Sequence, residues 1–95
     1  MLKPDLSIVI PTLNEAEALP LLLDDLVCQQ GLSFEVIIAD GGSADLTCQL
    51  ANGFFLSGRL SGRCLVASRG RGRQLNAGAL AATSDWLLFL HADSR

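Results

Sequence analysis

Long apolar runs are absent from this 95-residue sequence. None approaches the ~20 consecutive apolar residues that a membrane-spanning helix needs, so no transmembrane segment is predicted. The apolar stretch at residues 6–10 is too short for the hydrophobic part of a secretory leader, and Pro11 closes it. We therefore expect a cytoplasmic protein.

Cysteine and histidine are also scarce. The three cysteines, Cys28, Cys48 and Cys64, are odd in number, show no Cys-x-x-Cys spacing and have no paired histidine. This pattern predicts neither a disulfide framework nor a zinc site. We expect all three to be ordinary small residues in or near the core.

Charge is low as well, with 18% charged residues and a formal net charge of -3. Such a balance argues against a general nucleic-acid binder. Arginines between residues 59 and 73 make one stretch basic, but no aromatic residue interleaves with them, so no nucleic-acid partner is expected. The spacing of Gly70, Gly72 and Gly78 does not match a dinucleotide fingerprint.

Hydrophobic residues, by contrast, make up 49% of the chain, which indicates a folded globular domain. Strand-like and helix-like segments alternate with short connections, the pattern of a parallel α/β layer. The last apolar segment has no polar alternation, which is typical of a strand covered on both faces. Strands are expected at residues 6–10, 34–39, 64–67 and 86–90, with Pro11 ending the first.

Three helices are expected between these strands. Asn14 and Glu17 have the spacing of a capping pair for the first helix, Ser43 can cap the second, and Asn52-Gly53 would end it. Pro20 fits the first turn of the first helix. The third helix is expected at residues 73–83, while residues 54–62 are left unassigned. The residues expected to face the core are Leu19, Leu22, Leu23, Leu26 and Val27 in the first helix, Leu46 and Leu50 in the second, and Leu75, Ala79 and Ala82 in the third.

Polar side chains follow three of the predicted strands. Thr12, Asn14 and Glu15 follow the first, Asp40 the second and Asp93 the fourth. In open α/β sheets, ligands bind beyond the carboxyl ends of the strands, so these groups should share one edge. Carboxylates, hydroxyls and a nearby arginine are what a nucleotide diphosphate with a divalent ion requires.

Each of these residues also has a simpler interpretation. Asp40 before Gly41-Gly42 can be a turn residue that caps a helix. Asp93 can be a solvated carboxylate near the end of the chain, and an isolated histidine such as His91 is more often a hydrogen-bonded structural residue than a ligand. Only the combination of motifs favours a binding site.

Four motifs in this order resemble the family 2 glycosyltransferases, which have the GT-A fold. Residues 7–15, Ser-Ile-Val-Ile-Pro-Thr-Leu-Asn-Glu, resemble the first strand and nucleotide loop of the family. Residues 38–45, Ile-Ala-Asp-Gly-Gly-Ser-Ala-Asp, are similar to its Asp-Asp-Gly-Ser-x-Asp segment. Gly70-Arg71-Gly72 with Asn76 and Gly78 resembles its Gly-Lys-Gly and Asn-x-Gly helix, and residues 90–93, Leu-His-Ala-Asp, resemble its Asp-x-Asp strand end.

The resemblance implies a Rossmann-like parallel sheet flanked by helices, with strand order 3-2-1-4. It implies a nucleoside-diphosphate sugar as the ligand and Mn²⁺ or Mg²⁺ as the cofactor. Pro11, Thr12, Glu15 and Asp40 would line the base and ribose. Arg71 would approach the phosphates, and Asp93 would coordinate the metal.

Two positions depart from the family pattern. Gly41 stands where the family has the second Asp of Asp-Asp-Gly-Ser, and we expect little effect because Asp40 is kept as the base contact. His91 replaces the first Asp of Asp-x-Asp, so a neutral ring lies where a carboxylate would contact the ribose or a metal-bound water. A His-Ala-Asp variant resembles one bacterial subgroup of the family.

The resemblance also predicts that residues 1–95 are the donor-binding half of a transferase, truncated after the fourth strand. An inverting transfer needs a base within reach of the acceptor hydroxyl, and we identify no catalytic residue in this chain. The alternative is a non-catalytic nucleotide-binding module that needs a partner or forms a homo-oligomer through its open sheet edge. A phosphate-accepting signalling domain is less favoured, because the acidic cluster after the first strand is missing.

Overall fold

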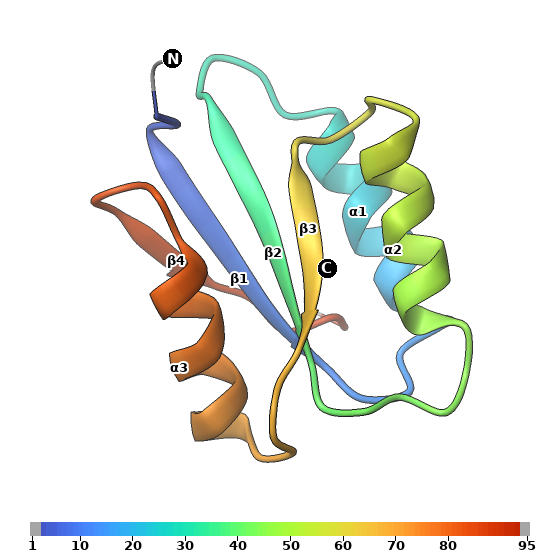
Figure 1. The fold of residues 1–95 in the computed structure, drawn as a ribbon. Helices are drawn as coiled ribbons and strands as arrows, with labels where there is room; N and C mark the ends of the chain where they lie inside the picture. The colour runs from blue at the N-terminus through green and yellow to red at the C-terminus, as the bar shows by residue number, and fades with distance from the viewer. Residues whose placement is uncertain (1–2, 94–95) are drawn as a thin grey trace.

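The computed structural model describes residues 3–93, which form one parallel sheet with three helices (Figure 1). Within this range no helix has both the length and the apolar character needed to cross a membrane. The elements are β1 (Leu6–Thr12), α1 (Leu19–Val27), β2 (Phe34–Asp40), α2 (Thr47–Leu56), β3 (Gly62–Val66), α3 (Arg71–Ala81) and β4 (Leu87–Phe89).

The sheet has the order β3-β2-β1-β4 with every neighbouring pair parallel, which confirms the predicted order 3-2-1-4. In Figure 1, α3 lies on one side of the sheet and α1 and α2 lie together on the other. The register pairs Thr12 with Asp40 at the carboxyl ends of the two central strands. Parallel pairing therefore brings two predicted site residues side by side.

The main core lies between β1, β2 and the pair of helices α1 and α2. Alternate strand residues, among them Ile8, Ile10 and Ile38, point toward these helices, where Phe54 and the α1 leucines pack. The predicted stripe of α1 is confirmed for Leu19, Leu22, Leu23 and Leu26, and Pro20 lies in the first turn as predicted. Val27 is wrong as a core residue, since it lies at the end of the helix and is exposed.

The packing of α3 differs from the prediction. Its buried residues are Gln74 and Gly78, while Leu75, Ala79 and Ala82 are only half-buried. A Cβ added to Gly78 would lie well inside van der Waals contact with Val9 on β1. Gly78 therefore lets α3 approach the sheet closely, which sets the position of the whole helix.

We expect Gly78→Ala to lower the free energy of unfolding by about 1–3 kcal/mol, because the methyl group overpacks the contact with Val9. Gly72→Ala on the same helix is the matched control, since nothing lies within 4 Å of its added Cβ. That change should be neutral or stabilise by up to about 1 kcal/mol. Urea unfolding of the two variants measures the difference, and equal stabilities would contradict the close packing of α3.

β1 does not end at Pro11 as predicted but continues to Thr12. Ser7 N–H donates to the Trp86 carbonyl and the Val9 carbonyl accepts from Leu90, so odd-numbered residues direct their backbone groups toward β4. Pro11 has the same orientation but lies beyond the residues paired with β4. Its missing N–H therefore costs no ladder hydrogen bond.

Both predicted helix caps are wrong. α1 begins at Leu19 rather than after Asn14, and α2 begins at Thr47, with no side-chain cap from Ser43. Asn52-Gly53 lies inside α2, which buries Ala51 and Phe54 while Leu46 and Leu50 are exposed. The capping side chains have other partners in the loops described below.

β4 is shorter than predicted and is not covered on both faces. Leu87, Leu88 and Phe89 are 39–47% exposed, and Trp86 is 74% exposed. β4 pairs only with β1, so within residues 3–93 its other edge is open. Pairing of two copies through this edge stays a prediction.

Two of the cysteines lie together. Cys48 on α2 and Cys64 on β3 are half-buried with their Sγ atoms 3.1 Å apart, and burial raises the pKa of both thiols. Both are near-core residues as predicted. Cys28 is exposed at the end of α1, so that prediction is wrong for this residue.

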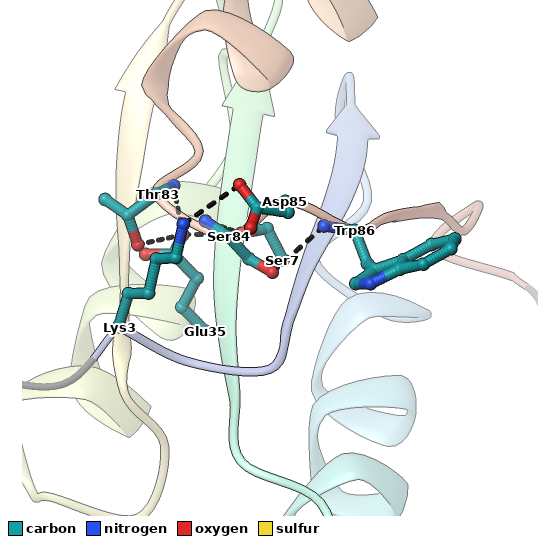
Figure 2. A network of polar contacts seen from close by, with 7 residues as sticks. All are labelled: Lys3, Ser7, Glu35, Thr83, Ser84, Asp85 and Trp86. Atoms are coloured by element: carbon teal, nitrogen blue, oxygen red, sulfur yellow. Dashed lines mark hydrogen bonds and ion pairs between the residues drawn. The ribbon is translucent and has the colours of Figure 1, made fainter.

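A polar network holds the start of β4 against the central strands (Figure 2). Glu35 Oε2 accepts hydrogen bonds from Ser7 Oγ at 2.6 Å and from the N–H and hydroxyl of Thr83 at 2.7 and 2.8 Å. Ser84 N–H donates in turn to Ser7 Oγ. Burial acts to raise the pKa of Glu35, but these bonds and Arg63 outweigh it and lower the pKa overall. The network fixes the register of the strand that leads to His91 and Asp93.

Candidate functional site

The carboxylate of Asp40 is the structural centre of the site. It lies at the end of β2, is 2% exposed and accepts four hydrogen bonds. Oδ1 accepts from Thr12 Oγ1 at 2.7 Å and Ser43 Oγ at 2.5 Å, and Oδ2 accepts from the N–H groups of Gly42 at 3.0 Å and Ser43 at 2.7 Å. Four acceptor positions are about the full capacity of a carboxylate.

These bonds also set the charge of Asp40. Burial acts to raise its pKa, but the bonds donated by Ser43, Thr12 and Gly42 outweigh burial and lower it overall. Asp40 is therefore a carboxylate at neutral pH and fixes the loop that follows β2.

The loops after β1 and β2 are joined by side-chain hydrogen bonds. Asn14 has φ of 54°; its N–H donates to Ser43 Oγ at 2.8 Å, and its Oδ1 accepts from Ala44 N–H at 2.8 Å. The N–H of Glu15 donates to Thr47 Oγ1 at 2.9 Å. The residues predicted to cap helices thus connect the two loops instead, because each finds a backbone partner across the sheet edge.

Arg71 and His91 meet beside these loops. Arg71 is the first residue of α3, and its Nη2 lies 2.7 Å from His91 Nε2. A guanidinium can only donate, so Nε2 must be the acceptor and the ring proton is assigned to Nδ1. Among residues 3–93 no carboxylate forms an ion pair with Arg71, which suits its guanidinium to an anionic ligand.

A shallow, open hollow of about 190 Å³ lies between these groups. It brings together five of the seven predicted site residues, with Asp40 directly beneath it through its bond to Thr12. The residues that line the hollow are Pro11, Thr12, Leu13, Glu15, Arg71, Gln74 and His91.

Asp93 does not line this hollow. It is exposed two residues beyond His91, and between them Ala92 is 2% exposed and packs in the main core. Buried Ala92 therefore anchors the segment after β4 to the core, while its neighbours His91 and Asp93 are exposed. The alternation of polar His91, apolar Ala92 and polar Asp93 in the sequence is the one local signal of this arrangement.

Gln74 lines the hollow although the sequence motifs did not predict it. Its side chain is 5% exposed and its amide reaches the carboxyl ends of both central strands. The one signal in the sequence is its spacing of four from Gly78, which places both on the same face of α3.

The residues present are compatible with a divalent cation. Among residues 3–93 there is no group of three or more metal-ligating side chains. Mg²⁺ and similar ions are commonly held by one or two carboxylates together with substrate phosphates. Asp93 can supply such a carboxylate, so a cation at this place would depend on bound phosphate.

The strand order and the flanking helices define an α/β protein of GT-A type. The sequence model of glycosyl transferase family 2 matches residues 7–95, and the chain belongs to this family.

Its relatives include the PGL/p-HBAD biosynthesis glycosyltransferase of Mycobacterium bovis, which is 42% identical over 98% of this chain and 37% of its own length. The chain thus spans little more than a third of that relative.

Solved structures show the same fold. The structure of S. aureus TarS 1–349 has a TM-score of 0.86 and 26% identity, over 97% of this chain and 28% of that one. Glucosyl-3-phosphoglycerate synthase from Mycobacterium tuberculosis in complex with UDP has a TM-score of 0.77 and 27% identity, over 95% of this chain and 34% of that one. The same synthase has also been solved with Mn²⁺, UDP and glucosyl-3-phosphoglycerate, at 23% identity and a TM-score of 0.70.

Proposed function

We propose that this chain is the donor-binding part of a glycosyltransferase and binds a nucleoside-diphosphate sugar together with Mn²⁺ or Mg²⁺. The observation that carries the proposal is the convergence on one hollow of groups from the ends of β1, α3 and the segment after β4. The complex of the similar M. tuberculosis synthase with UDP supports this ligand class.

In this proposal, Pro11, Thr12 and Glu15 line the base and ribose, and His91 lies beside the ribose. Arg71 binds the diphosphate, since it lines the hollow and its planar guanidinium can donate two hydrogen bonds to phosphate oxygens. Asp40 also contacts the base. Because its oxygens already accept four bonds, a base N–H has to displace a donor, and the hydroxyls of Thr12 and Ser43 are the ones that can rotate away.

Asp93 holds the divalent cation in this proposal. When bound, such an ion stabilises the negative charge of the departing diphosphate. Arg71 acts on the same charge through its guanidinium. We assign no catalytic base to this chain.

The alternative of a non-catalytic module is not favoured, since the relatives described above are named as glycosyltransferases or synthases. We also propose that residues 1–95 are the donor-binding half of a larger transferase domain.

Titration with UDP and with GDP, each with Mn²⁺, tests the proposed function. We expect one of the two to bind, and Arg71→Ala to weaken its affinity by about tenfold or more through loss of a charge-assisted phosphate contact. Arg69→Ala, two residues earlier and exposed, is the matched control and should bind like the unmodified chain. Equal affinity of the two arginine variants would contradict the role of Arg71.

A further inference from the structure

The side-chain amide of Gln74 makes three hydrogen bonds, each to a backbone group in a different segment around the hollow. Its Nε2 donates to the carbonyl of Thr12 at 2.8 Å and to the carbonyl of Ala39 at 2.9 Å. Its Oε1 accepts from the N–H of Gly70 at 3.1 Å. One side-chain amide thus connects the ends of β1 and β2 with the residue immediately before Arg71.

Gly41 provides the space for this amide. A Cβ built on Gly41 would lie 2.8 Å from Gln74 Oε1, 3.0 Å from Cδ and 3.2 Å from Nε2. Real Cβ atoms essentially never lie as close as 2.8 Å to another heavy atom, so the amide would have to shift, and any shift would distort its three hydrogen bonds. A side chain at residue 41 and the bound conformation of Gln74 therefore exclude each other.

This exclusion accounts for a departure noted in the sequence. Where the resembling segment has a second aspartate, this chain has Gly41, and the volume next to that position is filled by the amide of Gln74. The two residues are 33 positions apart, and only the tertiary structure brings them together.

We propose that Gln74 is a positioning residue for diphosphate binding, which fixes the start of α3 so that Arg71 faces the hollow, and that Gly41 is its required partner. This inference rests on the proposed nucleotide-sugar binding. Gln74 acts through Gly70 and Arg71 rather than by contact with the ligand, because all its polar atoms are directed to the backbone.

The test measures the affinity of the chain for UDP and, in parallel, GDP, each with Mn²⁺. Gln74→Ala should weaken binding of the nucleotide that binds by about tenfold, the size expected from the loss of one or two hydrogen bonds. Gln49→Ala on α2 is the matched control, since Gln49 is exposed. If Gln74→Ala does not fold, Gln74→Met keeps the volume without the hydrogen bonds and should give the same loss.

A double-mutant cycle separates positioning from general stabilisation. In an Arg71→Ala background, Gln74→Ala should cost little further affinity, whereas a purely structural role would give the full loss again. Gly41→Ala should also weaken binding, and Gly41→Ala with Gln74→Ala should bind no worse than Gln74→Ala alone.

The outcomes distinguish a failure of the proposed nucleotide binding from a failure of the positioning role of Gln74. If the unmodified chain binds neither UDP nor GDP, the proposed function fails, and this inference fails with it. If it binds one of them and Gln74→Ala or Gln74→Met binds equally well, or the losses at residues 71 and 74 simply add, the inference alone is wrong.

Discussion

Asp93→Asn is expected to remove the Mn²⁺-dependent part of nucleotide binding. An amide keeps the size of the side chain but loses the charge that a hard divalent cation requires. Changes to residues that only support metal ligands cost about 10–100-fold in metal affinity, so loss of the ligand itself should cost at least about 100-fold.

The measurement is a titration of nucleotide with and without Mn²⁺. The unmodified chain should bind more tightly with the metal, while Asp93→Asn should bind equally in both conditions, at the metal-free affinity. Asp24→Asn, an exposed change on α1, is the control and should keep the metal dependence. Because Asp93 is exposed, its loss should leave the unfolding midpoint unchanged, and unchanged metal-dependent affinity would refute its assignment.

Asp40→Asn is expected to damage the fold as well as the site. In the unmodified chain, the two carboxylate oxygens of Asp40 accept four hydrogen bonds. The amide of asparagine replaces one of these oxygens by an NH₂ group, which cannot accept, so at least one buried donor loses its acceptor. Loss of acceptors for buried donors predicts a decrease of about 3 kcal/mol in the free energy of unfolding at pH 7. Urea unfolding measures this, again with Asp24→Asn as the control.

The pH dependence of this effect has a definite sign. The pKa of Asp40 is lowered in the folded protein from the ordinary value of 3.8, so the folded state favours the ionised form. Its contribution to stability is complete above the unfolded pKa and disappears as the pH falls through the folded pKa. The stability difference between the unmodified chain and Asp40→Asn should therefore shrink below about pH 4. A difference that stays constant to lower pH would mean that charge is not the cause.

The strands were predictable because their signals are local. Short β-branched and apolar segments followed by turn residues identified β1, β2 and β3, apart from shifts of one or two residues at their ends. The error at Pro11 came from treating every β1 residue as paired on both sides, whereas β4 pairs with only three of them.

The buried face of a helix was harder to predict where apolar and polar residues are not clearly separated around the helix. α1 has four leucines on one side, and its buried face was predicted correctly except for Val27. α3 is made mostly of small and polar residues, so its orientation is decided by the contact of Gly78 with Val9 rather than by a hydrophobic stripe.

By itself, the sequence determined the α/β class and the set of polar residues at one edge of the sheet. It could do so because parallel strands place all their carboxyl ends together, whichever side chains follow them. Thr12, Glu15, Arg71 and His91 accordingly lie around one hollow.

Only the tertiary structure decided how these residues are held. The pairing of Arg71 with His91 and the fit of Gln74 beside Gly41 join segments that are separate in the sequence. The four hydrogen bonds that Asp40 accepts depend on the neighbouring strand and on the conformation of the loop after β2. Differences of a few tenths of an ångström decide whether such contacts form, and for Gln74 they depend on how closely α3 packs on the sheet. No local pattern of residue types encodes that distance.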